Sequence, residues 1–269
     1  MVNLAVPPAG ELIAPPDWRT VDFVSDLHLD AAHPATVQAF EGYLAATPAD
    51  AVFLLGDVFE VWAGDDALDE PGSFEAACCA LLQRTAQRIP LFFMHGNRDF
   101  LVAGEFSRRS GIPLLVDPTV LTFAGQRWLL SHGDALCLQD VDYQRFRAMA
   151  RNPQWQAQLL ARPLAERRAL GRSVRSESEA RKQSGTGFYG DVDTDAALAW
   201  LAAAQAPALI HGHTHLPADH VLREQGPDGT SPALTRHVLT DWDLDAQPPR
   251  AGVLRLTGQG LERVALVPK

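Results

Sequence analysis

The sequence predicts a mixed α/β protein, and three observations along the chain support this fold class. Three short apolar runs, at residues 21–25, 51–55 and 91–94, have the unbroken hydrophobicity of buried strands, and helical spacing follows the first two. Residues 120–131 predict a β-hairpin. The last fifty residues contain short runs that we expect to pair as antiparallel strands. A chain of 269 residues with this order of elements is compatible with one domain.

Helices are expected between these strands. Residues 34–46 have apolar side chains at helical spacing, and Ser73 can cap a helix that runs to about Gln87. Residues 140–185 have a helical, arginine-rich character, and a further helix is expected near 194–204. The remaining strands are placed at 208–210, 219–224, 234–240, 251–256 and 261–266.

The composition excludes several classes of protein. The formal charge is −10, from 23 basic and 33 acidic residues, which argues against a nucleic-acid binder with a broad basic face. The balance reverses between residues 140 and 189, where ten Lys/Arg stand against five Asp/Glu. The cysteines are Cys78, Cys79 and Cys137, an odd number that gives no disulfide framework and fits a reducing compartment.

The first twenty residues contain four prolines and lack both a basic start and an apolar core. They therefore predict a mobile N-terminal extension rather than a signal peptide, with residues 21–269 forming a single domain. No apolar run approaches the ~20 residues that a membrane-spanning helix needs. We expect a soluble protein that can still rest on a membrane surface.

Five polar segments each follow a predicted strand, where open α/β sheets place their ligands. They are Asp26-x-His28, Gly56-Asp57, Gly96-Asn97-Arg98-Asp99, Ser131-His132-Gly133-Asp134 and His211-Gly212-His213. Mixed oxygen and nitrogen donors of this kind suit Mn²⁺, Fe²⁺ or Zn²⁺. The seven donors exceed the needs of one tetrahedral ion and are enough for two ions that share a carboxylate and clamp a phosphoryl group. The alternative is that these side chains only form turns and caps.

The order of the five segments resembles the calcineurin-like metallophosphoesterases over about residues 21–240. The resemblance implies a four-layer β-sandwich flanked by helices, with a helical insertion at about 140–190 that caps the site. It also implies two sets of metal ligands. One ion would be held by Asp26, His28, Asp57 and His213. The other would share Asp57 and be held by Asn97, His132 and His211.

Arg98 narrows the substrate, because many members of the general family have a histidine after the asparagine. An arginine does not donate a proton near neutral pH, but its planar fork binds phosphate well. The sequence thus favours a substrate with a second phosphate and a leaving group that needs no proton. A phosphate monoester, with a second pKa of about 6, meets both conditions, which predicts attack on a pyrophosphate diester. The alternative is a surface ion pair between Arg98 and Asp99.

Longer strings are similar to the family of UDP-2,3-diacylglucosamine hydrolases, enzymes of lipid A synthesis in Gram-negative bacteria. These strings are SDLHLD, LGDVFEVWAGDD, MHGNRDFL, SHGDALC and IHGHTHLPA. The resemblance implies that water attacks the α-phosphorus and that UMP and 2,3-diacylglucosamine 1-phosphate are released. It also implies two Mn²⁺ ions and a cytoplasmic enzyme that associates peripherally with the inner membrane. It implies catalytic roles for Asp57, Asn97, Arg98 and His211. It implies substrate contacts from Asn97, Arg98, Asp140, Ser176 (or Ser178), Lys182 and His211.

Several residues keep two interpretations. Asp140 can cap the next helix or contact the substrate, and His215 can support a metal ligand or contact the substrate, or have neither role. Glu60, Asp65 and Asp66 are loop charges or residues that orient metal ligands. The insertion, with Trp155, Leu159 and Leu160 beside Arg162, Arg167, Arg168 and Arg172, suits an anionic bilayer surface, but it can equally be core packing with a solvated face.

The sequence is also compatible with two other functions. The first is another two-metal phosphodiesterase or nucleotide-sugar pyrophosphatase that acts on a soluble substrate. The second is a metal-bearing binding scaffold without catalysis, although complete retention of the seven donors argues against it.

Overall fold

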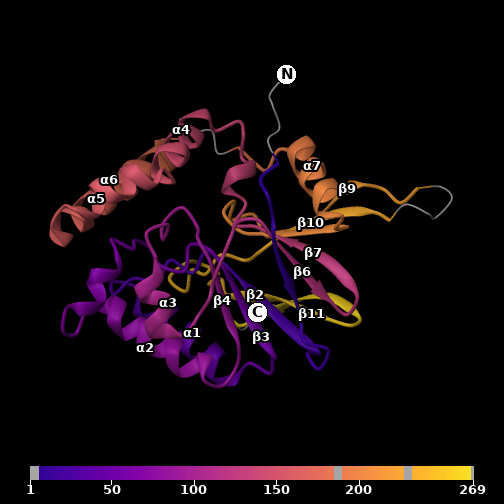
Figure 1. Cartoon of the computed structure of the whole chain (residues 1–269), viewed down its shortest axis with the longest axis horizontal. Coiled ribbons are helices and arrows are strands. Elements are labelled where there is room, and N and C mark those ends of the chain that lie inside the picture. Colours follow the sequence, from indigo (N-terminus) through magenta and orange to yellow (C-terminus); the bar gives the residue numbers. More distant parts are fainter. Residues whose placement is uncertain (1–5, 185–189, 227–231, 268–269) are drawn as a thin grey trace.

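The computed structural model describes residues 6–184, 190–226 and 232–267, apart from the side chains of 175–184. Two six-stranded sheets face each other, and helices cover both outer faces (Figure 1). Large side chains such as Phe23, Phe53, Leu130 and Ile210 fill the space between the sheets. Two further apolar clusters join each sheet to its helices. The four-layer sandwich expected from the sequence is therefore confirmed.

One sheet has the order β12-β11-β2-β3-β4-β5, and its central strands are parallel. Its strands are β2 (Thr20–Val24), β3 (Ala51–Leu55), β4 (Leu91–Met94), β5 (Leu114–Leu115), β11 (Gly252–Thr257) and β12 (Gly260–Ala265). Strands β3 and β4 have the predicted bounds, because an unbroken apolar run leaves few alternatives to a strand buried on both faces. Strand β11 pairs antiparallel with both β2 and β12.

The other sheet has the order β1-β6-β7-β8-β10-β9. Its strands are β1 (Gly10–Ile13), β6 (Thr119–Phe123), β7 (Gln126–Leu130), β8 (Ala208–His211), β9 (Asp219–Arg223) and β10 (Leu234–Val238). The hairpin of β6 and β7 is confirmed. The tail differs from the expectation in one respect, because β10 pairs parallel with β8 as well as antiparallel with β9. The pairing partner depends on how the chain returns to the sheet, which the hydrophobic pattern of one strand does not encode.

Residues 10–14 contradict the expectation of a mobile extension over residues 1–20, of which residues 1–5 lie outside the described residues. Gly10–Ile13 form β1, which pairs parallel with β6. The backbone N–H groups of Gly10 and Ala14 donate to the carbonyls of Pro118 and Thr122, both at 2.9 Å. Leu12 packs against the core between the sheets, whereas Ile13 is 78% exposed. A four-residue strand flanked by prolines gives too short a period to recognise from the sequence.

Four helices form the outer layers. Helices α1 (Pro34–Ala46), α2 (Phe74–Ala86) and α3 (Gly104–Ser110) pack on the sheet that contains β2–β4, and α7 (Thr194–Ala204) packs on the other. The bounds of α1 and α7 are those predicted. Ser73 caps α2 as expected, since its hydroxyl accepts a hydrogen bond from the Ala76 N–H at 3.1 Å. Two short 3₁₀ helices, η1 (Asp65–Asp69) and η2 (Asp134–Leu136), lie in the loops after β3 and β7.

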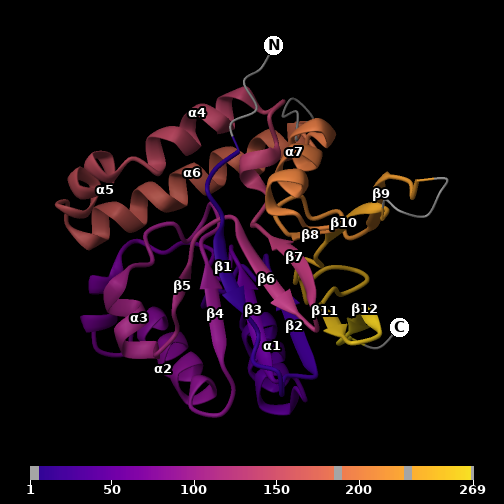
Figure 2. The ribbon, with the colours of Figure 1, turned by 45° about the vertical axis from the view of Figure 1, so that its right-hand side comes forward.

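The arginine-rich segment forms α4 (Val141–Ala150), α5 (Pro153–Leu160) and α6 (Leu164–Ser184). Figure 2 shows these helices across the end of the molecule at which β3 and β4 finish. Arg167, only 4% exposed, forms an ion pair with Asp66 and donates to the carbonyl of Ala63. None of the described helices is both long enough and apolar enough to cross a membrane.

Two further contacts of this segment bear on its expected membrane role. Arg168 pairs with Glu70 and Glu75, and Trp155 lies against Phe100 with ring centroids 6.3 Å apart. Arg167 and Arg168 therefore attach α6 to the body of the protein instead of facing an anionic bilayer, and Trp155 is packed as core.

Replacement of Leu12 tests whether β1 belongs to the folded core. Leu12→Ala should lower the free energy of unfolding by about 1–2 kcal/mol, because a half-buried leucine loses its contacts between the sheets. Ile13→Ala on the same strand is the matched control and should change it by about 0.5 kcal/mol or less. Urea unfolding measures both. Equal, negligible effects would restore the mobile extension.

Candidate metal centre

Five loop segments meet at one end of the two sheets. Asp26 and His28 follow β2, Asp57 follows β3, Asn97 follows β4, His132 follows β7, and His213 and His215 follow β8. Backbone hydrogen bonds join the loops to one another. The His28 N–H donates to the carbonyl of Asp57 at 3.0 Å, and the Gly212 N–H donates to the carbonyl of His132 at 3.0 Å. The side chains of these loops therefore converge, as the sequence predicted.

Five of these residues have a left-handed backbone. Their φ values are 52° for Asp26, 48° for His28, 52° for Asp57, 69° for His213 and 54° for His215. Non-glycine residues rarely adopt this conformation, and it concentrates at functional sites. It turns each side chain out of the strand direction and into the space between the loops. The concentration of this conformation at one place indicates a site built for a ligand.

Gly96 makes the close approach of two loops possible. A Cβ atom at this position would lie 2.1 Å from Oδ1 of Asp57. Only glycine leaves room there for the carboxylate, so the loop after β4 can bring Asn97 beside Asp57.

The first group of donors contains Asp26, His28 and His215, whose ligand atoms all lie within 4.8 Å of one another. Nε2 of His215 lies 3.3 Å from Oδ1 of Asp26 and 3.3 Å from Nε2 of His28. Nε2 of His28 lies 3.9 Å from Oδ2 of Asp57. Two imidazole nitrogens and carboxylate oxygens that face one another at these distances fit a shared cation.

The second group contains Asp57, Asn97, His132 and His213. Oδ1 of Asn97 lies 3.0 Å from Nε2 of His132 and 2.8 Å from Nδ1 of His213. Nε2 of His132 lies 3.7 Å from Oδ1 of Asp57. Asp57 thus stands between the two groups, with one carboxylate oxygen toward each. This arrangement fits two ions that share a carboxylate.

Contacts with the surrounding chain orient two of the imidazoles. Nδ1 of His132 lies 2.9 Å from the carbonyl of Leu55, so its proton is placed there and Nε2 is left for a ligand. Nδ1 of His28 lies 2.8 Å from Oε2 of Glu60, which has the same effect on that ring. Of the three loop acids, Glu60 thus touches a metal-ligand candidate. Asp65 instead accepts from the N–H groups of Ala103 and Phe106.

The electrostatics of the centre favour bound cations. Burial acts to raise the pKa of Asp26, but the neighbouring His215, His132 and His28 outweigh it, and this pKa lies below its usual range. Burial acts to lower the pKa of His132, but Asp57, Asp26 and Asp134 raise it to about 9. Burial lowers the pKa of His213 to about 4. The Asp26 carboxylate is therefore ionised, and its charge lies in a buried space.

The distances above do not include His211, whose Nε2 is buried without a hydrogen-bond partner among the described residues. It is fully buried, its Nδ1 lies 2.8 Å from the carbonyl of Gly212, and its ring packs against Gly133. Burial lowers its pKa to about 3, and the charges that act on it come from Arg236, Asp191 and His213. These distances bring six of the seven expected ligands together and add His215 beside Asp26 and His28, whereas the ligand role expected of His211 stays a prediction. The only local signal is the alternating triplet His211-x-His213-x-His215.

Arg98 lies at the edge of the centre and does not pair with Asp99. The Arg98 N–H donates to Oδ1 of Asp57 at 2.8 Å, and its Nη1 lies 3.8 Å from Oε1 of Glu60. Asp99 is fully buried and accepts from the N–H groups of Gly96 and Val58 at 2.7 and 2.8 Å. Burial and the charge of Asp57 raise the pKa of Asp99 to about 6.

The expected substrate contacts are only partly described. Asp140 caps α4, since its carboxylate accepts a hydrogen bond from the Tyr143 N–H at 3.1 Å. Ser176 (with Ser178) and Lys182 lie on α6 within the stretch whose side chains are outside the described residues. Nε2 of His95, just before Gly96, lies 2.6 Å from the carbonyl of Val102.

Helix α4 contacts the loops of the centre through residues that the sequence analysis missed. The Tyr143 hydroxyl donates to Asp134 at 2.5 Å, the Arg147 Nε donates to the same carboxylate at 2.9 Å, and the Arg151 Nη2 donates to the carbonyl of Gly96 at 2.9 Å. The spacing of four places these three side chains on one face of the helix. That spacing was the feature of the sequence from which these three contacts could have been predicted. The insertion is thereby tied to the loops that carry His132 and Asn97.

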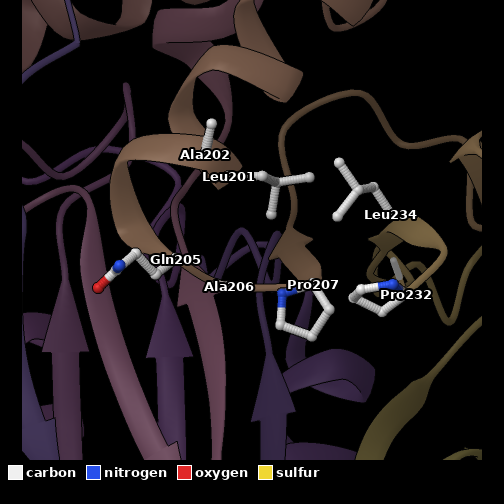
Figure 3. A pocket seen from close by; sticks show the side chains of 7 residues that line it. All are labelled: Leu201, Ala202, Gln205, Ala206, Pro207, Pro232 and Leu234. Carbon is white, nitrogen blue, oxygen red and sulfur yellow. The ribbon is translucent and has the colours of Figure 1, made fainter. Parts of the chain in front are cut away.

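A separate pocket of about 220 Å³ lies at the start of β8, whereas His213 and His215 follow the end of that strand (Figure 3). Its lining is Leu201, Ala202, Gln205, Ala206, Pro207, Pro232 and Leu234. These side chains offer no metal ligand or charged group, so the pocket takes no part in the chemistry of the centre.

Comparison with known proteins agrees with this geometry. Residues 19–217 match the family described as calcineurin-like phosphoesterase. The chain belongs to that family. Among curated proteins it is 46% identical over 249 residues to the UDP-2,3-diacylglucosamine hydrolase of Chromobacterium violaceum, which covers 91% of this chain and 98% of the relative. It is 45% identical over 246 residues to the enzyme of the same name from Bordetella pertussis, which covers 90% and 93%.

Comparison with solved structures gives weaker matches. An archaeal phosphodiesterase aligns with a TM-score of 0.41 and 11% identity over 91% of this chain and 99% of that chain. The zinc complex of Vps29 from Entamoeba histolytica aligns with a TM-score of 0.44 and 15% identity over 92% and 99%.

Substitution of the two alternating histidines separates ligand from packed residue. His215→Asn should lower the bound metal from two equivalents toward one, because it removes a donor from the group with Asp26 and His28. His211→Asn should retain both equivalents in the folded protein. Metal analysis after gel filtration, with circular dichroism as the folding control, measures this. Loss of metal from the His211 variant alone would assign the ligand to His211.

Proposed function

We propose that this calcineurin-like phosphoesterase hydrolyses the pyrophosphate bond of UDP-2,3-diacylglucosamine in lipid A biosynthesis. The products are UMP and 2,3-diacylglucosamine 1-phosphate, from attack of water on the α-phosphorus. The observation that carries the proposal is an arginine, Arg98, beside a two-metal centre in a chain 41–46% identical over about 90% of its length to hydrolases of that name. Such identity over nearly the whole chain supports the substrate, and the centre supports the chemistry.

Two divalent ions, Mn²⁺ in our proposal, fit the donor set. One would be held by Asp26, His28, Asp57 and His215. The other would be held by Asp57, Asn97, His132 and His213. When bound, such a pair supplies a nucleophile at neutral pH and neutralises charge on the phosphoryl group. Imidazole and carboxylate donors together match Mn²⁺ better than they match Ca²⁺.

Arg98 binds the phosphoryl oxygens in this proposal. Its backbone N–H is held by Asp57, which places the guanidinium beside the centre. Its Nε is buried without a hydrogen-bond partner among the described residues, so it is available to a ligand. Arginine holds phosphate through charge-assisted, paired hydrogen bonds. The leaving lipid phosphate needs no proton near neutral pH, so the site requires no acid at this position.

His213 takes the substrate-facing role that the sequence analysis gave to His211. Its ring lies 5.4 Å from the ring of Tyr143 and beside Asn97, at the boundary between the centre and α4. His211 is buried beneath Gly133 and positions the turn that carries His132. Asp57 and Asn97 hold the ions and orient the reacting phosphoryl group.

The lipid part of the substrate is assigned to the insertion. Helices α4–α6 cross the end of the molecule that holds the centre and carry partly exposed apolar side chains. These are Val141, Met149, Leu160, Leu170 and Val174. We extend the proposal to peripheral association with the cytoplasmic face of the inner membrane through this apolar surface. A soluble nucleotide-sugar substrate would have no use for it.

Hydrolysis in ¹⁸O-water tests the reaction. Purified protein with Mn²⁺ should convert UDP-2,3-diacylglucosamine and place the label in UMP, because water attacks the α-phosphorus. Mass spectrometry of both products measures this. Label in the lipid phosphate would contradict the assigned phosphorus. Cleavage of p-nitrophenyl diesters without turnover of the lipid would keep the two-metal site and favour a soluble substrate.

Removal of the Arg98 guanidinium tests its contact with phosphate. Arg98→Ala should reduce kcat/KM by about 10²-fold with both metals still bound, because a charge-assisted contact to the phosphoryl group is lost. Arg108→Ala, on the exposed face of α3, is the control and should keep wild-type rates. Steady-state kinetics with metal analysis measures both. Wild-type turnover by the Arg98 variant would remove its proposed role.

A further inference from the structure

Glu60 lies between His28, a candidate metal ligand, and Arg98, the candidate phosphate-binding residue. It lies three residues after Asp57, and only 7% of it is exposed. Oε2 lies 2.8 Å from Nδ1 of His28, and Oε1 lies 3.8 Å from Nη1 of Arg98. One carboxylate therefore contacts both a candidate metal ligand and the candidate phosphate-binding group.

The backbone around Glu60 holds this carboxylate in place. The Glu60 N–H donates to the carbonyl of Leu29 at 3.1 Å, and Leu29 forms a parallel bridge with Phe59. The Trp62 N–H donates to the carbonyl of Arg98 at 3.2 Å. The loops after β2, β3 and β4 are thus joined on both sides of Glu60. The carboxylate is constrained at both the His28 and the Arg98 ends.

The contact with His28 determines which ring nitrogen faces the centre. A proton on Nδ1 directed to Glu60 leaves the lone pair of Nε2 toward Asp57 and His215. Carboxylates that accept from the far nitrogen of a metal-bound histidine orient the ring and strengthen it as a ligand. Glu60 occupies that position for the ion held by Asp26, His28, Asp57 and His215.

The contact with Arg98 gives the same carboxylate a second effect. A guanidinium that lacked this neighbour would be repelled by the two cations and would turn toward solvent. With one oxygen on each partner, Glu60 offsets this repulsion and holds Arg98 near the place where the phosphoryl group binds. A substrate phosphate then meets an arginine already in position.

We propose that Glu60 is a positioning residue that orients His28 for one metal ion and at the same time holds Arg98 for the substrate phosphate. This inference rests on the two-metal function proposed above. The simpler interpretation is that Glu60 is a buried carboxylate that only stabilises the loop. The two differ in metal affinity and in the energetic coupling to Arg98, neither of which a purely structural carboxylate would change.

Titration with Mn²⁺ alone, by isothermal calorimetry on the metal-free full chain, tests the first effect. Glu60→Gln should weaken one of the two Mn²⁺ sites by about tenfold or more and leave the other near wild type. Glu60→Asp keeps the charge but shortens the side chain, so it should show the same loss. Glu75→Gln is the matched control, since Glu75 is 9% exposed and pairs with Arg168. Wild-type affinity at both sites in the Glu60 variants would overturn the proposal.

A double-mutant cycle on UMP binding in the presence of saturating Mn²⁺ tests the second effect. Arg98→Ala should weaken UMP binding strongly in the wild-type background and much less in the Glu60→Gln background. Equal losses in both backgrounds would show that Glu60 does not hold Arg98. Neither titration uses the lipid. The role of Glu60 can therefore be judged from these titrations even if the lipid proves not to be the substrate.

A measurement on the wild-type protein covers the case in which the Glu60 variants do not fold. Nitrogen-15 NMR of histidine-labelled, Zn²⁺-loaded protein reports the tautomer of each ring, and His28 should carry its proton on Nδ1. A proton on Nε2 of His28 would overturn the orientation that Glu60 is proposed to impose.

Discussion

The left-handed backbone at five positions of the centre is the constraint on which the remaining structure depends. Each such residue costs about 1–3 kcal/mol unless its surroundings enforce it. Here the enforcement comes from two directions. Loop-to-loop hydrogen bonds, such as those from the His213 N–H to Asp26, hold the turns together from within. The tightly packed phenylalanines between and beneath the sheets hold the strand ends from below. A well-packed sandwich therefore allows the metal loops to keep a conformation they would not adopt alone.

Much of the fold could be predicted from the sequence, because its central strands are buried on both faces. Strands β3 and β4 stand out as continuous apolar runs, and Ser73 marks the start of α2 by its capping chemistry. Strand β1 escaped prediction because four residues between prolines show no clear period. The parallel pairing of β10 with β8 escaped because period-two alternation reveals a strand and its faces, but not its neighbour.

Most of the candidate site could be predicted as well, and the exception has a physical explanation. In a regular strand His211, His213 and His215 would all point to one face, so spacing alone does not separate them. His211 ends β8 and stays in the packed layer, whereas the positive φ of His213 and His215 turns the chain toward the loops. Backbone geometry, which the motif does not encode, is the reason that we propose His213 and His215 as ligands. Arg167 and Arg168 show a similar limit, since composition alone does not distinguish a buried ion pair from a solvated face.

The contacts of α4 restrict how this family can vary. Tyr143, Arg147 and Arg151 connect the insertion to Asp134 and Gly96, which flank two of the candidate ligands. An insertion of this kind is not an exchangeable module, although it is continuous in the chain and lies at one edge of the molecule. A chimaera that took residues 140–190 from a distant relative would break the support of His132 and Asn97. A change in the insertion is therefore coupled to the side chains on the face of α4 that contacts these loops.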